Sequence, residues 1–297
     1  MENDFKTNDE ENLNIMSEET HPTSNKSSEE ALTDFTEFGI NTLRYVAVFK
    51  VKDFSQLLVK NPKNAFNHLV KLDKLTQKIK DKTIKYKFEE FTCGNRISVH
   101  SYMDTITFLS KGNTNVDCIA MLQAASTFFI GALSLNVFLS GYLSFGHFYI
   151  QAEKNIFCGN PFLDASIMAG SMQMVGLACD KVVEENLYEV KMLTKDKQLF
   201  SKFGHSLLTK WDVPIYGHIL TGGSVRKEMT MVDWPRLSSD VFETIKSYSL
   251  DEFYEPYQAI YGEFSKLDNP FQLYIEESLK FMNLCLNQTV KMVNATT

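Results

Sequence analysis

One acidic residue, Asp104, lies between two stretches whose residue types favour extended chain. Residues 97–102 alternate apolar and polar side chains, and Thr105 begins a second run rich in β-branched and aromatic residues. A carboxylate flanked by strands is costly to bury without a partner. We therefore expect Asp104 either to face water at a turn or to hold something positive.

The rest of the chain alternates strand-like and helical patterns that would position this turn. A strand–helix–strand–strand–helix–strand core predicts an α+β fold of ferredoxin-like type, in which helices pack on an antiparallel sheet and C-terminal helices follow. The pattern predicts strands at 44–51, 85–90, 97–111, 137–150, 155–161, 175–183 and 189–193, an irregular strand region at 210–233, and helices at 62–79, 116–134, 162–174, 237–250 and 252–293.

Charge and composition divide the chain into three parts. Residues 1–37 are acidic and polar with few large apolar side chains, so they are expected to form a disordered tail. We expect one folded domain at 38–235 and a helical extension at 236–297 that packs on it. The formal net charge of −7 argues against a general nucleic-acid-binding surface.

The cellular setting expected from these patterns is cytoplasmic. The five cysteines are dispersed without metal-ligand spacing, which indicates reduced thiols. The N-terminus lacks the basic and apolar pattern of a signal peptide. Residues 118–139 are long enough to span a membrane, but polar side chains interrupt them. We expect a buried helix running into a core strand there, and no membrane span.

The turn Tyr102-Met103-Asp104-Thr105-Ile106 resembles the strand–turn–strand of class III nucleotide cyclases, the adenylate and guanylate cyclase superfamily. The resemblance is greatest to stand-alone bacterial cyclase-like proteins, which include the pyrimidine cyclases of antiphage defence. In that superfamily the aspartate is one of two metal-binding carboxylates, so the resemblance makes Asp104 a metal ligand. Residues 140–159 and 175–183 are similar to two further segments of the superfamily, and the likeness covers roughly 44–183.

The resemblance also implies ligands and partners. It implies a nucleoside triphosphate, Mg²⁺ or Mn²⁺ if the protein is active, and a homodimer or a pair with a related cyclase domain, because class III sites form between two domains. It places Lys50 at the first metal aspartate, Asp53 at a glycine and Phe54 at a phenylalanine. The nucleotide-binding residues that it implies are Lys50, Phe54, His147 and Gly159.

Several positions depart from the superfamily pattern, so no residue is assigned a catalytic role. A protonated lysine cannot ligate a metal, and the charge of Lys50 would repel one. Asp53 adds negative charge where a glycine would let backbone N–H groups approach phosphates. The transition-state asparagine and arginine would fall near Leu163 and Ile167, and a basic residue is replaced by Ser140.

These departures leave more than one function compatible with the sequence. The chain is a nucleotide cyclase-like protein that binds a triphosphate, with a degraded metal site. It could be an active cyclase with altered ligation, in which Asp104 is helped by Asp53, His147 or Asp164. It could instead be an inactive pseudo-cyclase that acts as a nucleotide-binding or protein-interaction module, in which Lys50 pairs with Asp104 or with a phosphate.

Overall fold

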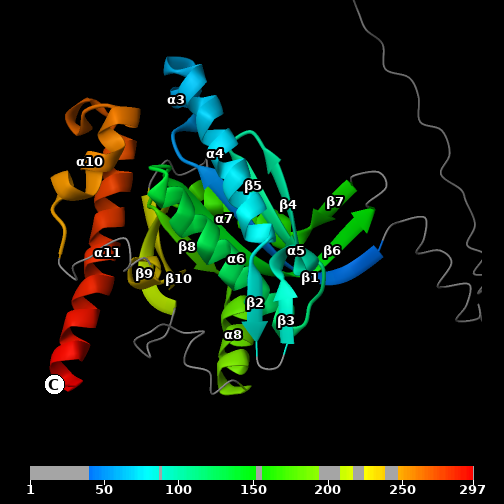
Figure 1. Ribbon diagram of the computed structural model, residues 1–297. Helices are drawn as coiled ribbons and strands as arrows, with labels where there is room; N and C mark the ends of the chain where they lie inside the picture. The colour runs from blue at the N-terminus through cyan, green and yellow to red at the C-terminus, as the bar shows by residue number, and fades with distance from the viewer. Residues whose placement is uncertain are drawn as a thin grey trace, which may run out of the picture. The chain divides into compact units, whose positions relative to one another are not determined.

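The computed structural model describes residues 40–86, 89–151, 156–193, 208–216, 224–237 and 247–296. The expected tail at 1–37 lies outside the described residues. From Ile40 onward the chain belongs to one compact unit (Figure 1).

The unit is built on a mixed sheet in the order β4-β5-β1-β6-β8-β10-β9, with β7 paired to β6. Within its first four strands every pairing is antiparallel, whereas β6 and β8 run parallel. The order β4-β5-β1-β6 is that of a ferredoxin-like sandwich, which confirms the predicted α+β class. The strands are β1 (Ile40–Val51), β4 (Ile97–Tyr102), β5 (Thr105–Ser110), β6 (Leu139–Gln151), β7 (Ile156–Gly159), β8 (Gly176–Cys179), β9 (Leu208–Tyr216) and β10 (Ser224–Val232), with β2 (Thr83–Tyr86) and β3 (Glu89–Thr92) forming a separate hairpin.

Helices follow or separate these strands along the chain. The longest of the predicted helices in the first half, α6, begins with a reciprocal capping box between Thr114 and Asp117. The described helices are α3 (Phe54–Lys60), α4 (Pro62–Lys80), α5 (Cys93–Arg96), α6 (Asn115–Ser134), α7 (Asn160–Ser171), α8 (Lys181–Leu193), α9 (Trp234–Leu237), α10 (Leu250–Tyr261) and α11 (Asn269–Thr296), with a 3₁₀ turn η3 (Phe264–Lys266).

Helices α6 and α7 cover opposite faces of β1. The Phe49 ring packs 4.9 Å from that of Phe128 on α6, measured between centroids. Its neighbour Lys50 lines a cavity together with Phe162 and Ser166 of α7. Successive side chains of a strand point to opposite faces, so β1 is sandwiched between the two helices. Helix α4 packs against α6 and also contacts β4.

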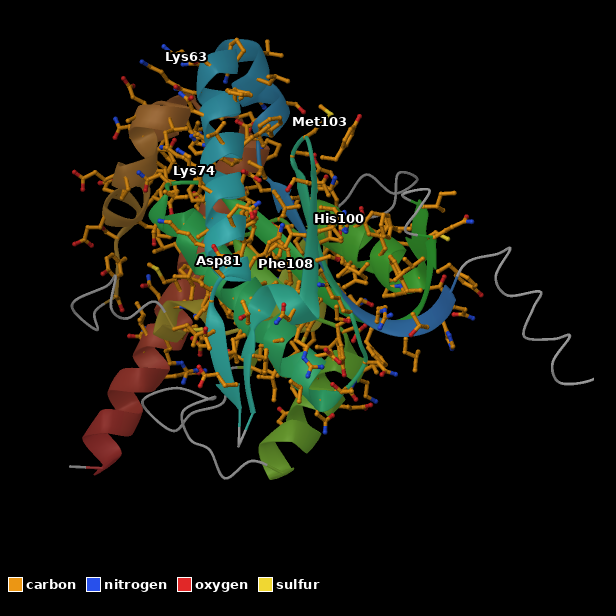
Figure 2. The ribbon with its side chains drawn as sticks, turned by 45° about the vertical axis from the view of Figure 1, so that its right-hand side comes forward. Lys63, Lys74, Asp81, His100, Met103 and Phe108 are labelled. Atoms are coloured by element: carbon orange, nitrogen blue, oxygen red, sulfur yellow. The ribbon has the colours of Figure 1, made fainter. Side chains whose placement is uncertain are left out.

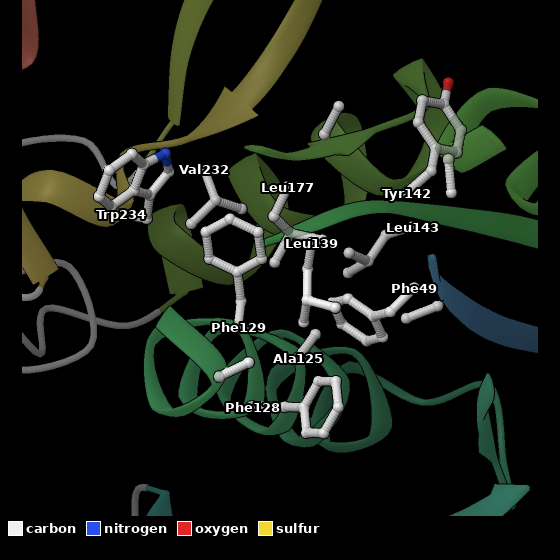
Figure 3. Packing of buried hydrophobic residues seen from close by; sticks show 14 of the residues in the cluster. Phe49, Ala125, Phe128, Phe129, Leu139, Tyr142, Leu143, Leu177, Val232 and Trp234 are labelled. Carbon is white, nitrogen blue, oxygen red and sulfur yellow. The ribbon is translucent and has the colours of Figure 1, made fainter. Parts of the chain in front are cut away.

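The core of the unit is centred on α6, as expected for residues 118–139. In the described part of the chain, α6 is the one helix long and apolar enough to cross a membrane, and 67% of its most apolar window is buried in the fold. Figure 3 shows Ala125, Phe128 and Phe129 of α6 directed at Phe49, Leu139 and Leu177 of the sheet. Burial of this apolar surface is the main source of stability.

One predicted strand is wrong. Residues 189–193 belong to helix α8, and the strand expected at 175–183 ends at Cys179. Asp180 explains the change, because its carboxylate accepts a hydrogen bond of 2.7 Å from the backbone N–H of Val183 and so caps the new helix. Val183 and Leu187, one helical turn apart, are both buried. Buried side chains at helical spacing therefore replace the alternating burial that a strand would show.

The C-terminal helices are attached to the sheet through a group of aromatic rings around Phe138. This ring is fully buried and stacks on Tyr257 of α10 at a centroid distance of 3.8 Å. It also contacts Phe271 and Tyr274 of α11 edge-on. The Tyr274 hydroxyl donates a hydrogen bond of 3.1 Å to the carbonyl of Leu139. One side chain before β6 thus joins both helices to the core.

We expect Phe138→Ala to lower the free energy of unfolding by about 3–5 kcal/mol, because the substitution opens a cavity among rings from three elements. Chemical denaturation followed by tryptophan fluorescence measures the change. Phe66→Ala is the matched control, since Phe66 is 65% exposed and should cost less than about 0.5 kcal/mol. Equal losses in the two variants would show that α10 and α11 are not held by Phe138.

Candidate functional site

The turn that carries Asp104 is tied to the end of the central strand. Tyr102 and Thr105 pair across β4 and β5, and Met103 between them has a left-handed backbone, with φ of 51°. The carbonyl of Asp104 accepts a hydrogen bond of 2.8 Å from the backbone N–H of Val51. Figure 2 shows Met103 at the tip of this hairpin and His100 lower on β4. Asp104 is therefore held beside the last residues of β1.

The positive group beside Asp104 is Lys50. Its Nζ lies 3.7 Å from Oδ1 of Asp104 and donates a hydrogen bond of 2.5 Å to Oγ1 of Thr105. The Thr105 hydroxyl in turn donates to Oδ1 of Asp104 at 3.0 Å. The two charged side chains are 26% and 36% exposed, so water screens the pair and it contributes little to stability.

These residues do not fit the two-metal centre that the resemblance implies. Divalent Mg²⁺ or Mn²⁺ binds several oxygen ligands, and here one carboxylate, that of Asp104, stands next to a threonine hydroxyl and an ammonium group. The ammonium of Lys50 would repel a divalent cation at this distance. Across the described ranges of the chain, no group of three or more His, Cys, Asp or Glu side chains is arranged to hold a metal ion.

Lys50 also borders a cavity of about 540 Å³ between β4, β5 and α7. Its side chain is the one Lys, Arg, Asp or Glu among the described residues that line this space. The other lining groups are aromatic rings, hydroxyls and one leucine: His100, Ser101, Tyr102, Thr105, Thr107, Leu109, Phe148, Phe157, Phe162 and Ser166. A single cation with aromatic and hydroxyl neighbours suits an anionic ligand that carries a planar ring.

His100 belongs to the apolar part of this cavity. The imidazole of His100 lies 4.8 Å from the ring of Phe157, measured between centroids. Burial, helped by the charge of Lys80, lowers the pKa of His100 below its ordinary value. The imidazole is therefore neutral at physiological pH and adds no second positive charge beside Lys50.

A smaller cavity of about 210 Å³ lies between α6 and α10. Among its described lining residues Glu252 is the one that carries a charge, and the rest are largely apolar, such as Phe253 and Tyr257. A carboxylate without a cation disfavours anionic ligands. The Lys50 cavity is for that reason the better site for a phosphate-bearing molecule.

The other nucleotide-binding residues that the resemblance implies lie outside the lining of the Lys50 cavity. Phe54 is buried at the start of α3. His147 is exposed on β6, where its Nδ1 lies 3.2 Å from Oδ1 of Asn41. Gly159 pairs so closely with β6 that an added Cβ would lie 2.5 Å from the carbonyl oxygen of His147. Asp164 is exposed on α7.

Asp53 occupies a backbone conformation that favours glycine. Its φ of 55° and ψ of 19° are left-handed, and its side chain makes no capping hydrogen bond to α3. Partial burial, and then the nearby carboxylate of Asp268, raise the pKa of Asp53 to about 6. The backbone of this turn thus matches the glycine that the resemblance placed there, whereas the side chain adds a negative charge near that of Asp268.

Lys52, which lies between Lys50 and Asp53 in the sequence, anchors α7, the helix that forms one wall of the cavity. Its ammonium donates hydrogen bonds to the carbonyls of Ala169, Gly170 and Met172 at 3.0, 3.2 and 2.9 Å. These carbonyls are at the C-terminal end of α7, where a cation is favoured. Burial, with the charge of Lys50 added, lowers the pKa of Lys52 to about 7. The position of α7 therefore depends on Lys52.

Sequence reasoning missed the aromatic side of the cavity. Phe157 and Phe162 flank the turn into α7, and Ser166 follows one helical turn later. The Pro161 next to Phe162 was a usable signal for the helix start. Nothing in the local pattern, however, shows that both rings face Lys50 of a strand a hundred residues earlier.

No family model and no curated protein matches this sequence. Among solved structures, the chain is similar to a bacterial light-regulated adenylyl cyclase at 11% identity and TM-score 0.44, over 66% of this chain and 53% of that chain. The match thus spans about half the length of that structure.

Two further structures are similar to the chain. One is the catalytic core of a rhodopsin-guanylyl cyclase with converted specificity, bound to ATPαS, at 8% identity and TM-score 0.42, over 65% of this chain and 97% of that chain. The other is a class III adenylyl cyclase-like ATP-binding protein from Pseudomonas aeruginosa, at 10% identity and TM-score 0.34, over 49% of this chain and 35% of that chain. Each of these structures is described as a cyclase or a cyclase-like protein. With TM-scores below 0.5 they stand as likenesses, and the fold rests on the strand pairing described above.

We expect Asp53→Asn to stabilise the protein above pH 6 and not at pH 4. Native Asp53 binds its proton more tightly than the unfolded chain does, so its carboxylate costs stability as pH rises from about 4 to about 6. Asparagine tolerates the left-handed backbone and removes the charge. The gain at pH 8 should be about 1 kcal/mol after allowance for solvent screening. Denaturation at both pH values, with Asp73→Asn as the control, measures it; a gain equal at pH 4 and pH 8 would contradict the assignment.

Proposed function

We propose that this protein is a cyclase-like nucleotide-binding protein in which Lys50, and not a pair of metal ions, receives the phosphate of the ligand. The observation that carries the proposal is the position of the Lys50 ammonium. It borders a 540 Å³ cavity as the one charged lining group and lies 3.7 Å from Asp104, which the resemblance makes a metal ligand. An ammonium group at that point supplies the positive charge that a metal ion would otherwise provide.

The dimensions and chemistry of the cavity support a nucleotide as the ligand. Small-molecule sites usually have volumes of about 300–1,000 Å³ and combine apolar walls with a few polar groups. Phe157 and Phe162 provide faces on which a nucleobase can stack. The hydroxyls of Ser101, Thr107 and Ser166 provide hydrogen-bond partners for a sugar or a base edge.

Loss of catalysis is part of the proposal. Cyclisation of a triphosphate needs stabilisation of charge on the leaving pyrophosphate, and this electrostatic term is usually the largest in catalysis. The positions that the resemblance gives to the transition-state asparagine and arginine are Leu163 and Ile167, whose side chains are apolar and 56% and 57% exposed. Neither side chain can stabilise an anion.

A second candidate function, a protein-interaction module, is favoured by exposed apolar side chains on α7 and at the tip of the β4–β5 hairpin. Leu163 and Ile167 of α7 lie on the outside of the helix, and Tyr102 and Met103 at the hairpin tip are 78% and 54% exposed. Exposed apolar side chains in such number near one cavity often mark an interface. We infer that a second copy of the chain or a related cyclase domain covers this face, in a cytoplasmic setting.

The first test measures nucleotide binding by calorimetry with the four ribonucleoside triphosphates, with and without Mg²⁺. We expect binding that persists in EDTA. Lys50→Ala should weaken it about tenfold or more, because a hydrogen bond to a charged group is lost. Lys181→Ala is the control, since Lys181 is exposed and pairs with Glu185 on α8. Unchanged affinity in Lys50→Ala would refute the proposed phosphate contact.

Asp104→Asn separates the proposed site from an active cyclase. The carboxylate of Asp104 neutralises part of the charge of Lys50, so its removal should strengthen nucleotide binding severalfold in EDTA. If Asp104 binds a metal ion, with help from Asp53, His147 or Asp164, the substitution should weaken Mg²⁺-dependent binding instead.

The same samples are then incubated with Mg²⁺ or Mn²⁺ and examined by mass spectrometry. We expect no cyclic monophosphate. A product that requires Asp104 would replace the proposal with an active cyclase of altered ligation.

A further inference from the structure

A stripe of lysines runs along the outer face of α4. Lys63, Lys71, Lys74 and Lys78 are all exposed, and at 100° per residue they lie within an arc of about 80° that extends for about 22 Å along the helix. The opposite face of α4 is buried, through residues such as Leu72 and Ile79. Figure 2 shows Lys63 and Lys74 on this helix. We call the four residues the lysine stripe.

The charge of the lysine stripe is not compensated locally. Among the residues that the structure describes, no carboxylate forms an ion pair with any of the four ammonium groups. Residues 58–82 contain seven lysines and two aspartates, in a chain whose formal net charge is −7. An unpaired positive stripe on an acidic protein concentrates anions at one place on its surface.

Apolar side chains lie at one end of the stripe, where α3 meets α4. Val59 is 85% exposed, Phe66 is 65% exposed and Leu58 is 40% exposed. Phe66 is on α4 itself, about 60° round the helix from Lys63. Lysines beside exposed aromatic and aliphatic side chains are the composition of segments that lie in a membrane interface.

We propose that the lysine stripe and the α3–α4 corner form a binding surface for anionic phospholipid bilayers. The lysines face the lipid headgroups, while Val59 and Phe66 enter the region between headgroups and acyl chains. The apolar corner favours a bilayer over a nucleic acid, because a phosphate backbone offers nothing for an exposed valine to enter. The surface is separate from the Lys50 cavity, so the inference is independent of the proposed nucleotide site.

The test is co-sedimentation of the 297-residue chain with vesicles of phosphatidylcholine alone and of phosphatidylcholine with phosphatidylserine, at several salt concentrations. We expect binding to the anionic vesicles alone, weakening as salt rises. Each neutralised lysine should weaken it roughly fivefold, so the double variant Lys71→Gln with Lys74→Gln should weaken it about 25-fold. The control is Lys181→Gln with Lys227→Gln, two exposed lysines on other elements.

Phe66→Ser distinguishes the bilayer from other polyanions. It should weaken vesicle binding and leave binding to a short DNA duplex unchanged. No binding of the wild-type protein to anionic vesicles would overturn the inference, as would equal losses in the two double variants. If DNA is bound more tightly than vesicles and Phe66→Ser affects neither, the lysine stripe serves a nucleic acid instead. Circular dichroism of each variant confirms that the fold is retained.

Discussion

The structure depends on the burial of β1 from both faces. Residues 45–49 of this strand are almost fully inaccessible, because α6 packs on one side and α7 on the other. A strand in that position must be apolar throughout, and the backbone pairing with β5 and β6 satisfies its polar groups. A charged side chain is tolerable only where α6 and α7 no longer shield the strand from solvent. Lys50 stands at that point, next to the cavity and the hairpin of Asp104.

The electrostatics of the site follow from this placement. A partly exposed ammonium beside a partly exposed carboxylate makes a weak ion pair, which a ligand phosphate can exchange for its own charge. A divalent cation at the same place would meet the charge of Lys50 before it met enough oxygen ligands. The site is therefore suited to holding an anion and poorly suited to the two-metal chemistry that the resemblance implies.

The walls of the cavity depend on contacts far from Lys50. Helix α7 is held at its C-terminal end by three hydrogen bonds from Lys52, and the C-terminal helices are joined to the start of β6 by Phe138 and Tyr274. Asp53, next to Lys52, has a left-handed backbone, and its carboxylate makes no capping hydrogen bond to α3. Such a residue is retained at a cost to stability, as strained or charged residues near binding sites often are.

The sequence by itself determined the local features. Apolar runs and alternation placed the strands around Asp104 and the helix after Thr114, because burial imposes a period on side chains wherever the element is long. The likeness of a few segments to class III cyclases placed Lys50 at the expected position of the first metal aspartate. Residues 189–193 were misassigned because a short apolar run fits a strand or a helix equally well, and the cap at Asp180 decided the matter.

Only the tertiary structure decided which residues meet. The pairing of Lys50 with Asp104 depends on strand order, and the presence of Phe157 and Phe162 in the same cavity depends on the direction of α7. The residues that line this cavity come from positions as far apart as 50 and 166. Periodicity reports which face of an element is buried and carries no information about the partner across the sheet. Periodicity also places the four lysines on the polar face of α4, but whether carboxylates of other elements pair with them is decided by the tertiary structure.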